Sequence, residues 1–412
     1  MSKNDTSALC LGDADAVLAL FDSRGLRRVV DFETFSVVHP FALAAIATML
    51  RDNEGAGLFQ PINVAHRGSR WVWDAMGLRH LVSGQDPPSP GEPGRTAKLR
   101  RVKGRSDTSR VSRRMASLVS PNCNDTQNML AYVFDELIRN AIQHSCDPDG
   151  AVVCAQRMDP RHEDENTVIQ LCVADAGIGI PASLAQKRNG VVDGLAALSV
   201  AIEPHVSGAF EKGAYGSSDN AGLGLFVTTE IVKRTAGKTL LASRGGSLFI
   251  QGDPKFASNH RVATMAGAYP GTLVAFEMNV IGADGSVIPD TSFDDLLAVI
   301  LNEAERRNPG KGTSGVLDFS PPPGWHRVLA SLIIGSLEDV EKLRAPLQSK
   351  VEHGQSVTVD FLNVPGVTQS QVHALLFDLI RKSAACGSRV GILNATPTVR
   401  SVLEFLESYA LK

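Results

Sequence analysis

The chain lacks the features that would place a protein in a membrane or in an oxidising compartment. Its 412 residues contain no apolar run near the roughly 20 residues that a bilayer-spanning helix needs. Its six cysteines form no C-x-x-C pair, and the N-terminus lacks the basic-then-apolar pattern of a secretory signal. We therefore expect no membrane contact and a location in the reducing cytoplasm.

Aromatic residues are also scarce, at 6% of the chain, and the formal net charge is only -3. A hydrophobic content of 43% with 21% charged residues nevertheless indicates a globular protein that buries cores. Because the chain is too long for one ordinary core, we expect about two or three domains.

One stretch departs from the even balance of charge. Residues 95–114 are strongly basic, and Asp107 is their one acid. Such a run can grip nucleic acid or acidic protein, but this one has no aromatic residue for base stacking. Residues 85–94, just upstream, have the Pro/Gly-rich composition of a linker. We therefore favour a linker over 85–114, after a first domain of residues 1–84, and nucleic acid is the less favoured partner of this stretch.

Strands alternating with helices are expected at both ends of the chain, which is typical of small α/β sheets. The N-terminal pattern predicts strands at 29–32 and 59–65 and helices at 39–51 and 69–76. Near the C-terminus, Val359-Asp360-Phe361 corresponds to Val30-Asp31-Phe32 at a constant offset of 329 residues. A strand at 389–393 and a helix at 399–408 then follow the same order. We expect residues 283–412 to hold a connector, with a helix at 292–307, and a second module of this kind.

These two flanks resemble STAS domains, the fold of anti-sigma-factor antagonists, through an Asp-Phe strand followed by a loop and a helix. The resemblance implies a phosphate-accepting serine at the helix N-terminus, where amide groups and the helix dipole suit an anion. Pro40 and Gln369 occupy the equivalent positions, so neither flank has that serine. Thr368 and Ser370 are alternative acceptors, although a helix-capping role is commoner for such residues. We expect the flanks to bind a protein partner or a second copy of the chain, as a homodimer.

The middle of the chain begins with an amphipathic helix expected over residues 131–145. Glu136, Asn140 and His144 recur at i, i+4 and i+8, so they share one face of this helix. A carboxylate and an amide oxygen one turn apart can position a water and hold Mg²⁺, which prefers oxygen ligands. The alternative is an ordinary amphipathic helix, because this spacing alone is common.

Two glycine boxes follow this helix. The first, Asp175-Ala176-Gly177-Ile178-Gly179-Ile180-Pro181, ends an expected strand at 168–174 and presents a carboxylate beside backbone that can approach a flat ring closely. The second, Asn220-Ala221-Gly222-Leu223-Gly224-Leu225-Phe226, opens a helix whose free amides and dipole favour phosphate. The order of the three motifs predicts one nucleotide site.

This constellation resembles the GHKL family, named for gyrase, heat-shock chaperones, histidine kinases and MutL, over residues 124–279. The resemblance implies a Bergerat-type ATP-binding sandwich of the α+β kind at 115–282, within a chain that is α/β as a whole. It implies ATP and Mg²⁺ as ligands, with Glu136 as general base and Asn140 as the metal ligand. The implied nucleotide contacts are Asp175 to the adenine amino group, Thr272 to adenine through water, Gly177, Gly179 and Ile180 around the ring, and Gly222, Leu223, Gly224 and Leu225 at the phosphates.

Two departures from the family pattern narrow the function. Gln143 stands where histidine kinases usually have lysine, so a phosphate contact would come from His144 or from the long lid between Pro181 and Asn220. No phosphoacceptor histidine box of the usual kind precedes Ala131. We therefore favour an ATP-hydrolysing switch that controls the interactions of the flanks. The alternatives are a serine/threonine kinase acting in trans, like the anti-sigma-factor kinases, and a non-catalytic scaffold that depends on nucleotide.

Overall fold

The computed structural model describes most of the chain, and every structural statement below refers to this part of it. The described residues are 7–9, 11, 14–21, 28–31, 35–50, 59–62, 74–160, 166–186, 194–204, 206, 223–235, 237–253, 261–264, 269–282, 285–288, 291–307, 315–331, 337–364 and 367–411.

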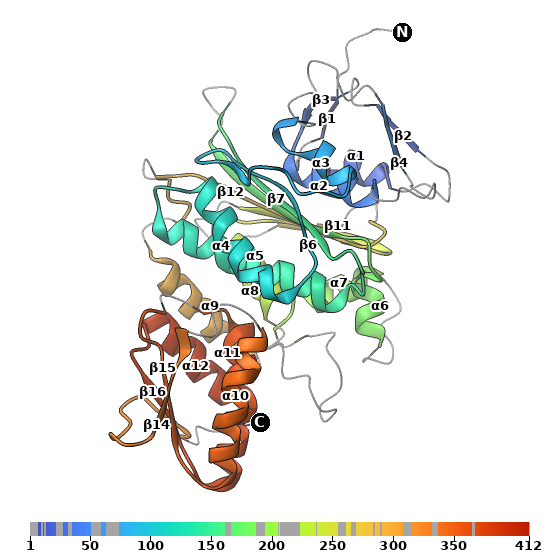
Figure 1. Ribbon diagram of the computed structural model, residues 1–412. Coiled ribbons are helices and arrows are strands. Elements are labelled where there is room, and N and C mark those ends of the chain that lie inside the picture. The colour runs from blue at the N-terminus through green and yellow to red at the C-terminus, as the bar shows by residue number, and fades with distance from the viewer. Residues whose placement is uncertain are drawn as a thin grey trace, which may run out of the picture.

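An eight-stranded sheet runs through the middle of the molecule (Figure 1). Its strand order is β11-β10-β9-β12-β8-β7-β6-β5, and every neighbouring pair is antiparallel. The strands are β5 (Gly91–Glu92), β6 (Thr96–Val102), β7 (Ala151–Met158), β8 (Val168–Asp175), β9 (Lys238–Ser243), β10 (Gly246–Gln251), β11 (Arg261–Thr264) and β12 (Thr272–Asn279). The strand expected at 168–174 is therefore confirmed as β8.

Helices cover one face of this sheet and form the largest core. They are α4 (Arg105–Val119), α5 (Asn124–His144) and α8 (Gly224–Arg234), with the short helices α6 (Gly179–Ala185) and α7 (Gly194–Ala201) at one end. The stripe expected on residues 131–145 is confirmed, because Val133, Phe134, Leu137 and Ile138 are all buried. The helix itself begins earlier, at Asn124.

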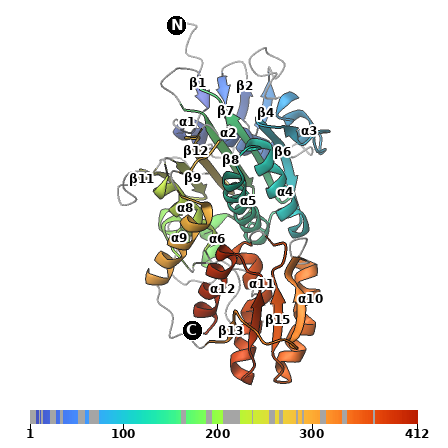
Figure 2. The same cartoon turned by 90° about the vertical axis from the view of Figure 1, so that its left-hand side faces the viewer.

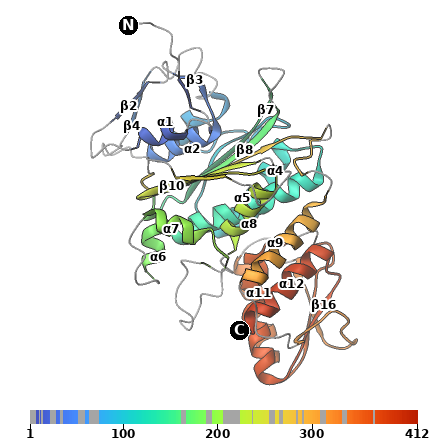
Figure 3. The same ribbon diagram turned by 180° about the vertical axis from the view of Figure 1, so that it is seen from behind.

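The N-terminal segment covers the opposite face of the sheet (Figure 3). It contains β1 (Ser7–Leu9), α1 (Ala14–Ala19), β2 (Arg28–Asp31), β3 (Phe35–Val38), α2 (Pro40–Met49), β4 (Phe59–Ile62) and α3 (Leu78–Val82), with parallel pairs β1–β3 and β2–β4. Every residue of α2 is buried, because this apolar helix packs against β7, β8 and β12. The elements expected at 29–32, 39–51 and 59–65 are confirmed, whereas most of the helix expected at 69–76 lies outside the described residues.

Hydrogen bonds fasten α2 to the sheet. The backbone N–H of Phe41 donates to Oε1 of Gln170 in β8 at 3.1 Å. Nε2 of the fully buried Gln170 in turn donates to Oε2 of Glu277 at 2.8 Å. Tyr269 donates its hydroxyl to the carbonyl of Ala45 at 3.4 Å. The N-terminal segment is thus a second layer on the central sheet and shares a core with it.

The structure corrects the expectation of a linker at 85–114. This segment contains β5, β6 and the first part of α4, and β6 pairs antiparallel with β7 along the sheet. Ala97, Leu99 and Val102 of β6 are buried, and Arg101 forms an ion pair with Asp149 at 3.4 Å. Basic residues alternate with apolar ones in this strand. The prediction of a linker rested on the charge of the segment and therefore missed the strand pattern.

A smaller parallel sheet follows the connecting helix α9 (Phe293–Arg307), which confirms the helix expected at 292–307 (Figure 2). Its order is β13-β16-β15-β14, from β13 (Leu317–Asp318), β14 (His326–Leu329), β15 (Val357–Asp360) and β16 (Val390–Leu393). Its helices are α10 (Leu337–Glu352), α11 (Gln369–Cys386) and α12 (Pro397–Ala410). The expected strand at 389–393 and helix at 399–408 are confirmed as β16 and α12.

The two flanks keep the expected offset of 329 residues in one strand and one helix each. β2 starts at Arg28 and β15 at Val357, while α2 starts at Pro40 and α11 at Gln369. In each flank the strand, the helix and a strand parallel to the first occur in this order, although β3 also stands between β2 and α2. This common order supports a related plan for the two flanks, and their identity as STAS domains stays a prediction.

Thr368 caps α11, as the commoner use of such a residue predicts. Its hydroxyl accepts the backbone N–H of Gln371 at 3.3 Å, and the Gln371 side chain accepts the N–H of Thr368 at 2.9 Å. Thr368 is also buried, so its hydroxyl serves the helix N-terminus rather than an incoming phosphate.

None of the described helices combines the length and the apolar character needed to cross a bilayer.

Replacing Gln170 by Leu should loosen the attachment of α2 to the sheet. The change leaves the Phe41 N–H and the Glu277 carboxylate without this buried partner, which we expect to cost about 2 kcal/mol of unfolding free energy. The midpoint of urea unfolding measures the effect. Gln355→Leu, the same change at an exposed position, is the control. Equal midpoints for the two variants would contradict the attachment.

Candidate functional site

The predicted motifs meet at one end of the central sheet, around a cavity between α5, α6 and α8. Its empty volume, including the open mouth, is about 830 Å³. The predicted site residues in its lining are Glu136, Asn140, His144, Asp175, Gly179, Ile180, Leu223, Gly224, Leu225 and Thr272. Gly177 is not part of this lining but donates its backbone N–H to Asp175, and Gly222 lies outside the described residues.

Strand register places three polar residues side by side at the floor of the cavity. Thr272, at the start of β12, is paired with Asp175 at the end of β8 and with Ser243 at the end of β9. Oδ1 of Asp175 accepts the backbone N–H of Thr272 at 3.2 Å and that of Gly177 at 2.9 Å. Because two amides hold this buried carboxylate, its orientation is set by the backbone.

The first glycine box needs its glycines for close approach. A Cβ on Gly177 would lie 2.0 Å from the carbonyl oxygen of Ser145 at the end of α5. Gly179 has a φ of +79°, in the left-handed region, and a Cβ there would lie 2.8 Å from Oγ of Ser243. The loop after β8 can therefore pass between α5 and β9 only with glycine at both positions.

The second glycine box brings α8 against α5. A Cβ on Gly224 would lie 2.6 Å from Oε2 of Glu136 and 3.3 Å from Nδ2 of Asn140. The N-terminus of α8 thus approaches the one carboxylate and the one amide that the sequence placed on a common face of α5. Glu136 is only 2% exposed, so its carboxylate acts in a largely dry setting.

Ser243 is a site residue that sequence reasoning missed. Its hydroxyl accepts the backbone N–H of Ile180 at 2.9 Å and donates to the carbonyl of Gly271 at 2.8 Å. It therefore joins the first glycine box to the turn before Thr272. Only the register of β9 beside β12 reveals this role, and no local motif marks it.

Two further residues hold the loop after β8 from outside the cavity. Oδ2 of Asp147 accepts the backbone N–H of Ala176 at 2.9 Å, and Arg244 donates to the carbonyl of Gly177 at 3.1 Å. Both come from turns that the sequence marks as turns, through Pro148-Asp149-Gly150 and Gly245-Gly246, but not as parts of a site. They position the loop that carries Asp175.

A charged cluster ties α8 to α9. Burial alone would raise the pKa of the Glu230 carboxyl, but hydrogen bonds from Lys233 and Arg234 hold that pKa below its ordinary value. Arg307 of α9 approaches the same carboxylate at 3.7 Å and reaches Glu203, after α7, at 3.6 Å. The helix that begins at Gly224 is therefore linked to the connector that leads to the C-terminal module.

The donor set in the cavity suits a cation that needs few protein ligands. Within the described part of the chain, no group of three or more His, Cys, Asp or Glu side chains could enclose a metal ion. Mg²⁺ in nucleotide sites is held by one or two protein oxygens together with phosphates and water. Asn140, whose side-chain amide lies beside Gly224 and includes one oxygen ligand, fits that role.

Comparison with known protein families agrees with this geometry. Residues 125–256 match the family model described as histidine kinase-, DNA gyrase B-, and HSP90-like ATPase. This chain therefore contains a GHKL-type ATPase domain, as the three motifs predicted. Searches of curated proteins and of solved structures found no match.

Replacing Gly224 by Ala should disturb the contact between α8 and α5. Alanine usually stabilises a helix relative to glycine, but its methyl group would collide with Glu136, and we expect a net loss of about 1–3 kcal/mol. Urea unfolding measures this loss. The control is Gly104→Ala, where a Cβ would meet nothing closer than Oγ of Ser106 at 3.5 Å. A Gly224→Ala protein as stable as this control would contradict the close approach.

Proposed function

We propose that this chain binds Mg²⁺-ATP in the cavity and hydrolyses it to change how its flanks meet a protein partner or a second copy. The observation that carries the proposal is the convergence of Glu136 and Asn140, Asp175, and Gly224 on one cavity from three separate segments. The family match over residues 125–256 supports ATP as the ligand.

Asp175 would recognise the adenine ring. An ionised carboxylate accepts hydrogen bonds, so it can pair with the exocyclic amino group of adenine. The amides of Gly177 and Thr272 already fix the Asp175 carboxylate, so little ordering is needed when the ring arrives. Ile180 and Val274 in the same lining supply apolar surface for the faces of the ring.

The N-terminus of α8 would receive the phosphates. Free backbone amides and the helix dipole at Gly224 and Leu225 favour negative charge. Asn140 would hold Mg²⁺, which when bound offsets the charge of the phosphate oxygens. His144 lines the same cavity and would contact phosphate in place of the lysine that Gln143 replaces.

Glu136 would act as the general base in hydrolysis. Its carboxylate takes a proton from the attacking water as the water oxygen bonds to the terminal phosphorus. The bond from that phosphorus to the bridging oxygen breaks, and ADP leaves with the bridging oxygen. The contact between Glu136 and Gly224 supports this role, because it keeps the base beside the proposed phosphate end.

The contacts of α8 would carry the state of the nucleotide to the flanks. Arg307 joins α9 to Glu230 of α8 and to Glu203. A shift of either glutamate would therefore displace α9, which leads to the C-terminal module. The flanks have an α/β plan and resemble STAS domains, which bind proteins. This resemblance supports a protein as the partner. Signalling through such contacts is the role we propose.

Replacing Glu136 by Gln should abolish hydrolysis and spare nucleotide binding. Glutamine keeps the shape of the side chain but cannot accept the proton, and we expect kcat to fall about 100-fold or more. Release of free phosphate and ATP affinity are measured on the same protein. Glu404→Gln, at an exposed position far from the cavity, is the control. Loss of ATP affinity in Glu136→Gln would count against the general-base role.

Replacing Asp175 by Asn should weaken ATP binding itself. The amide oxygen can still accept the two backbone N–H groups, but the amide nitrogen would face the adenine amino group as a second donor. We expect affinity to fall about 10- to 100-fold, because a hydrogen bond to a charged group is lost. Calorimetric titration with ATP tests this, with Asp318→Asn as control, since Asp318 also accepts a backbone N–H. Unchanged affinity would remove Asp175 from the adenine site.

A further inference from the structure

A second cavity lies where the ATPase domain meets the C-terminal module. Its lining comes from α4, α5, α9 and the N-terminal ends of α11 and α12, and its empty volume is about 680 Å³. On α5 it is bounded by Ala131, Tyr132 and Asp135, and it shares no lining residue with the nucleotide cavity, although Tyr132 stands one turn before Glu136. It is therefore separate from the nucleotide cavity, and junctions of this kind are common places for small ligands.

Two buried hydroxyl groups in this lining have no partner among the described residues. They are the hydroxyls of Tyr132 and Thr398, and each residue is only 5% exposed. Leaving such a group buried and unpaired costs free energy, so native structures usually supply a partner for it. A bound molecule in the cavity would provide one.

Several neighbouring polar groups of the lining are paired with one another. Asp135 accepts from Oγ of Ser109 at 2.7 Å and forms an ion pair with Arg139 at 2.6 Å. Nε2 of Gln371 donates to Oγ of Ser109 at 2.9 Å and so joins α11 to α4. Since the junction is otherwise well paired, loose docking of the C-terminal module does not explain the unpaired hydroxyls.

Tyr132 offers a hydrogen-bond donor to an entering molecule. Burial, and then the charges of Glu136 and Asp135, raise the pKa of the Tyr132 phenol well above its ordinary value, so the phenol keeps its proton. The ring of Tyr132 meets that of Phe293 edge to face, with centroids 5.7 Å apart. Leu297 and Val367 extend this apolar wall.

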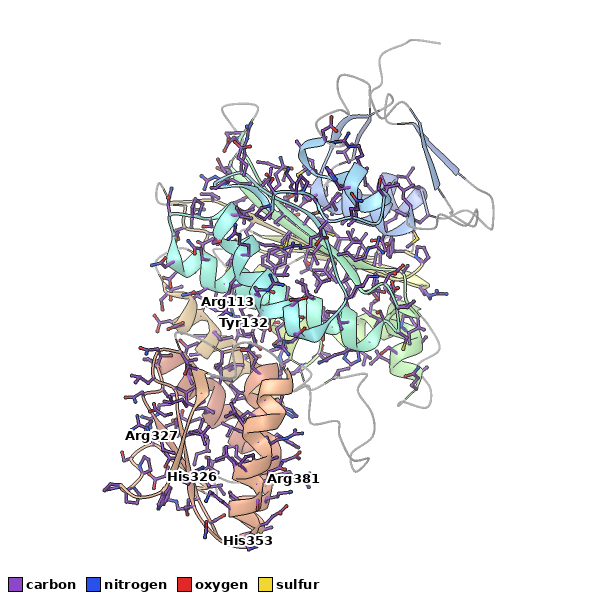
Figure 4. The ribbon with its side chains drawn as sticks, viewed as in Figure 1. Arg113, Tyr132, His326, Arg327, His353 and Arg381 are labelled. Atoms are coloured by element: carbon purple, nitrogen blue, oxygen red, sulfur yellow. The ribbon has the colours of Figure 1, made fainter. Side chains whose placement is uncertain are left out.

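The mouth of the cavity favours an anion. Arg113 and Asn128 lie there with exposed side chains, and Figure 4 shows Arg113 close to Tyr132. Arg113 also borders a neighbouring groove that contains Arg114 together with Arg100 and Arg110, which pair with Asp86 and Asp107. The lining also holds two acids: Asp135 is paired with Arg139, and Asp294 sits in the first turn of α9, where the helix dipole offsets part of its charge. Positive charge gathered at a mouth raises the local concentration of anions.

We propose that this cavity binds a small organic acid. The apolar part of this ligand would lie against Phe293 and Leu297. An acceptor atom on the same part would receive hydrogen bonds from Tyr132 and Thr398. The ligand's carboxylate or phosphate would meet Arg113 at the mouth. Such a ligand would contact both the ATPase domain and the C-terminal module, and its binding does not depend on hydrolysis of ATP.

Saturation-transfer NMR on the full chain tests the proposal with two probes. 4-Acetylbenzoate combines a ring and a carbonyl with a carboxylate, and uridine 5′-monophosphate combines a ring and carbonyls with a phosphate. An excess of a non-hydrolysable ATP analogue keeps the probes out of the nucleotide cavity. We expect transfer to the ring protons of at least one probe, and the probe that responds identifies the anionic group.

Matched variants locate the binding. Tyr132→Phe and Arg113→Gln should each weaken the responding probe about tenfold, the effect of one hydrogen bond. Tyr269→Phe removes a hydroxyl that is already bonded to Ala45 and should leave probe affinity unchanged, whereas Arg114→Gln, in the neighbouring groove, should lower it far less than Arg113→Gln does. Because Tyr132→Phe removes an unpaired group, the melting temperature of the ligand-free variant should equal or exceed that of the wild type.

Three results would overturn the proposal. One is the absence of transfer to both probes at millimolar concentration. Another is probe binding that survives both Tyr132→Phe and Arg113→Gln. The third is a lower melting temperature for ligand-free Tyr132→Phe, which would mean that buried water already satisfies the hydroxyl.

Discussion

The carboxylate of Asp175, fixed by two backbone amides at the end of β8, is the interaction on which the site depends. Its place follows from the register of three neighbouring strands, which aligns Asp175, Thr272 and Ser243 in one row. A slip of one residue in β8 would turn Asp175 to the opposite face of the sheet. The glycines of the first box then let the chain pass between α5 and β9, so the same register also sets the position of Gly179 beside Ser243.

Both flanks of the ATPase domain are built into its packing. On one face, α2 covers the sheet and shields it from solvent. A hydrogen bond from the backbone N–H of Phe41 to Gln170 holds it there. On the other side, Arg307 links α9 to Glu230 of the helix that begins at the second glycine box. A change in the position of α8 therefore has a direct path of contacts to the C-terminal module. This arrangement distinguishes the chain from a nucleotide domain carried on loose linkers.

The features predicted from the sequence were those encoded locally. The face shared by Glu136 and Asn140 follows from helical spacing alone. The first glycine box directly follows the strand that it ends, and the second directly precedes the helix that it begins. The features that were missed depend on which strands become neighbours. Ser243 is an ordinary strand residue until β9 lies beside β12. In the same way, the basic residues of β6 have the composition of a solvated run. Only the pairing of β6 with β7 shows that they belong to a strand, in which Arg101 forms an ion pair with Asp149 just before β7.

The fate of the terminal phosphate of ATP tests the central claim most directly. Purified full-length chain is incubated with Mg²⁺ and ATP labelled at the terminal phosphate, and label is followed both as free phosphate and on protein, with and without an added STAS-domain protein. We predict that the label appears as free phosphate and that none is retained on protein. Stable label on the chain or on the added protein would contradict the hydrolytic switch and establish a kinase. Binding of ATP without either product would contradict it in favour of a static nucleotide-bound scaffold.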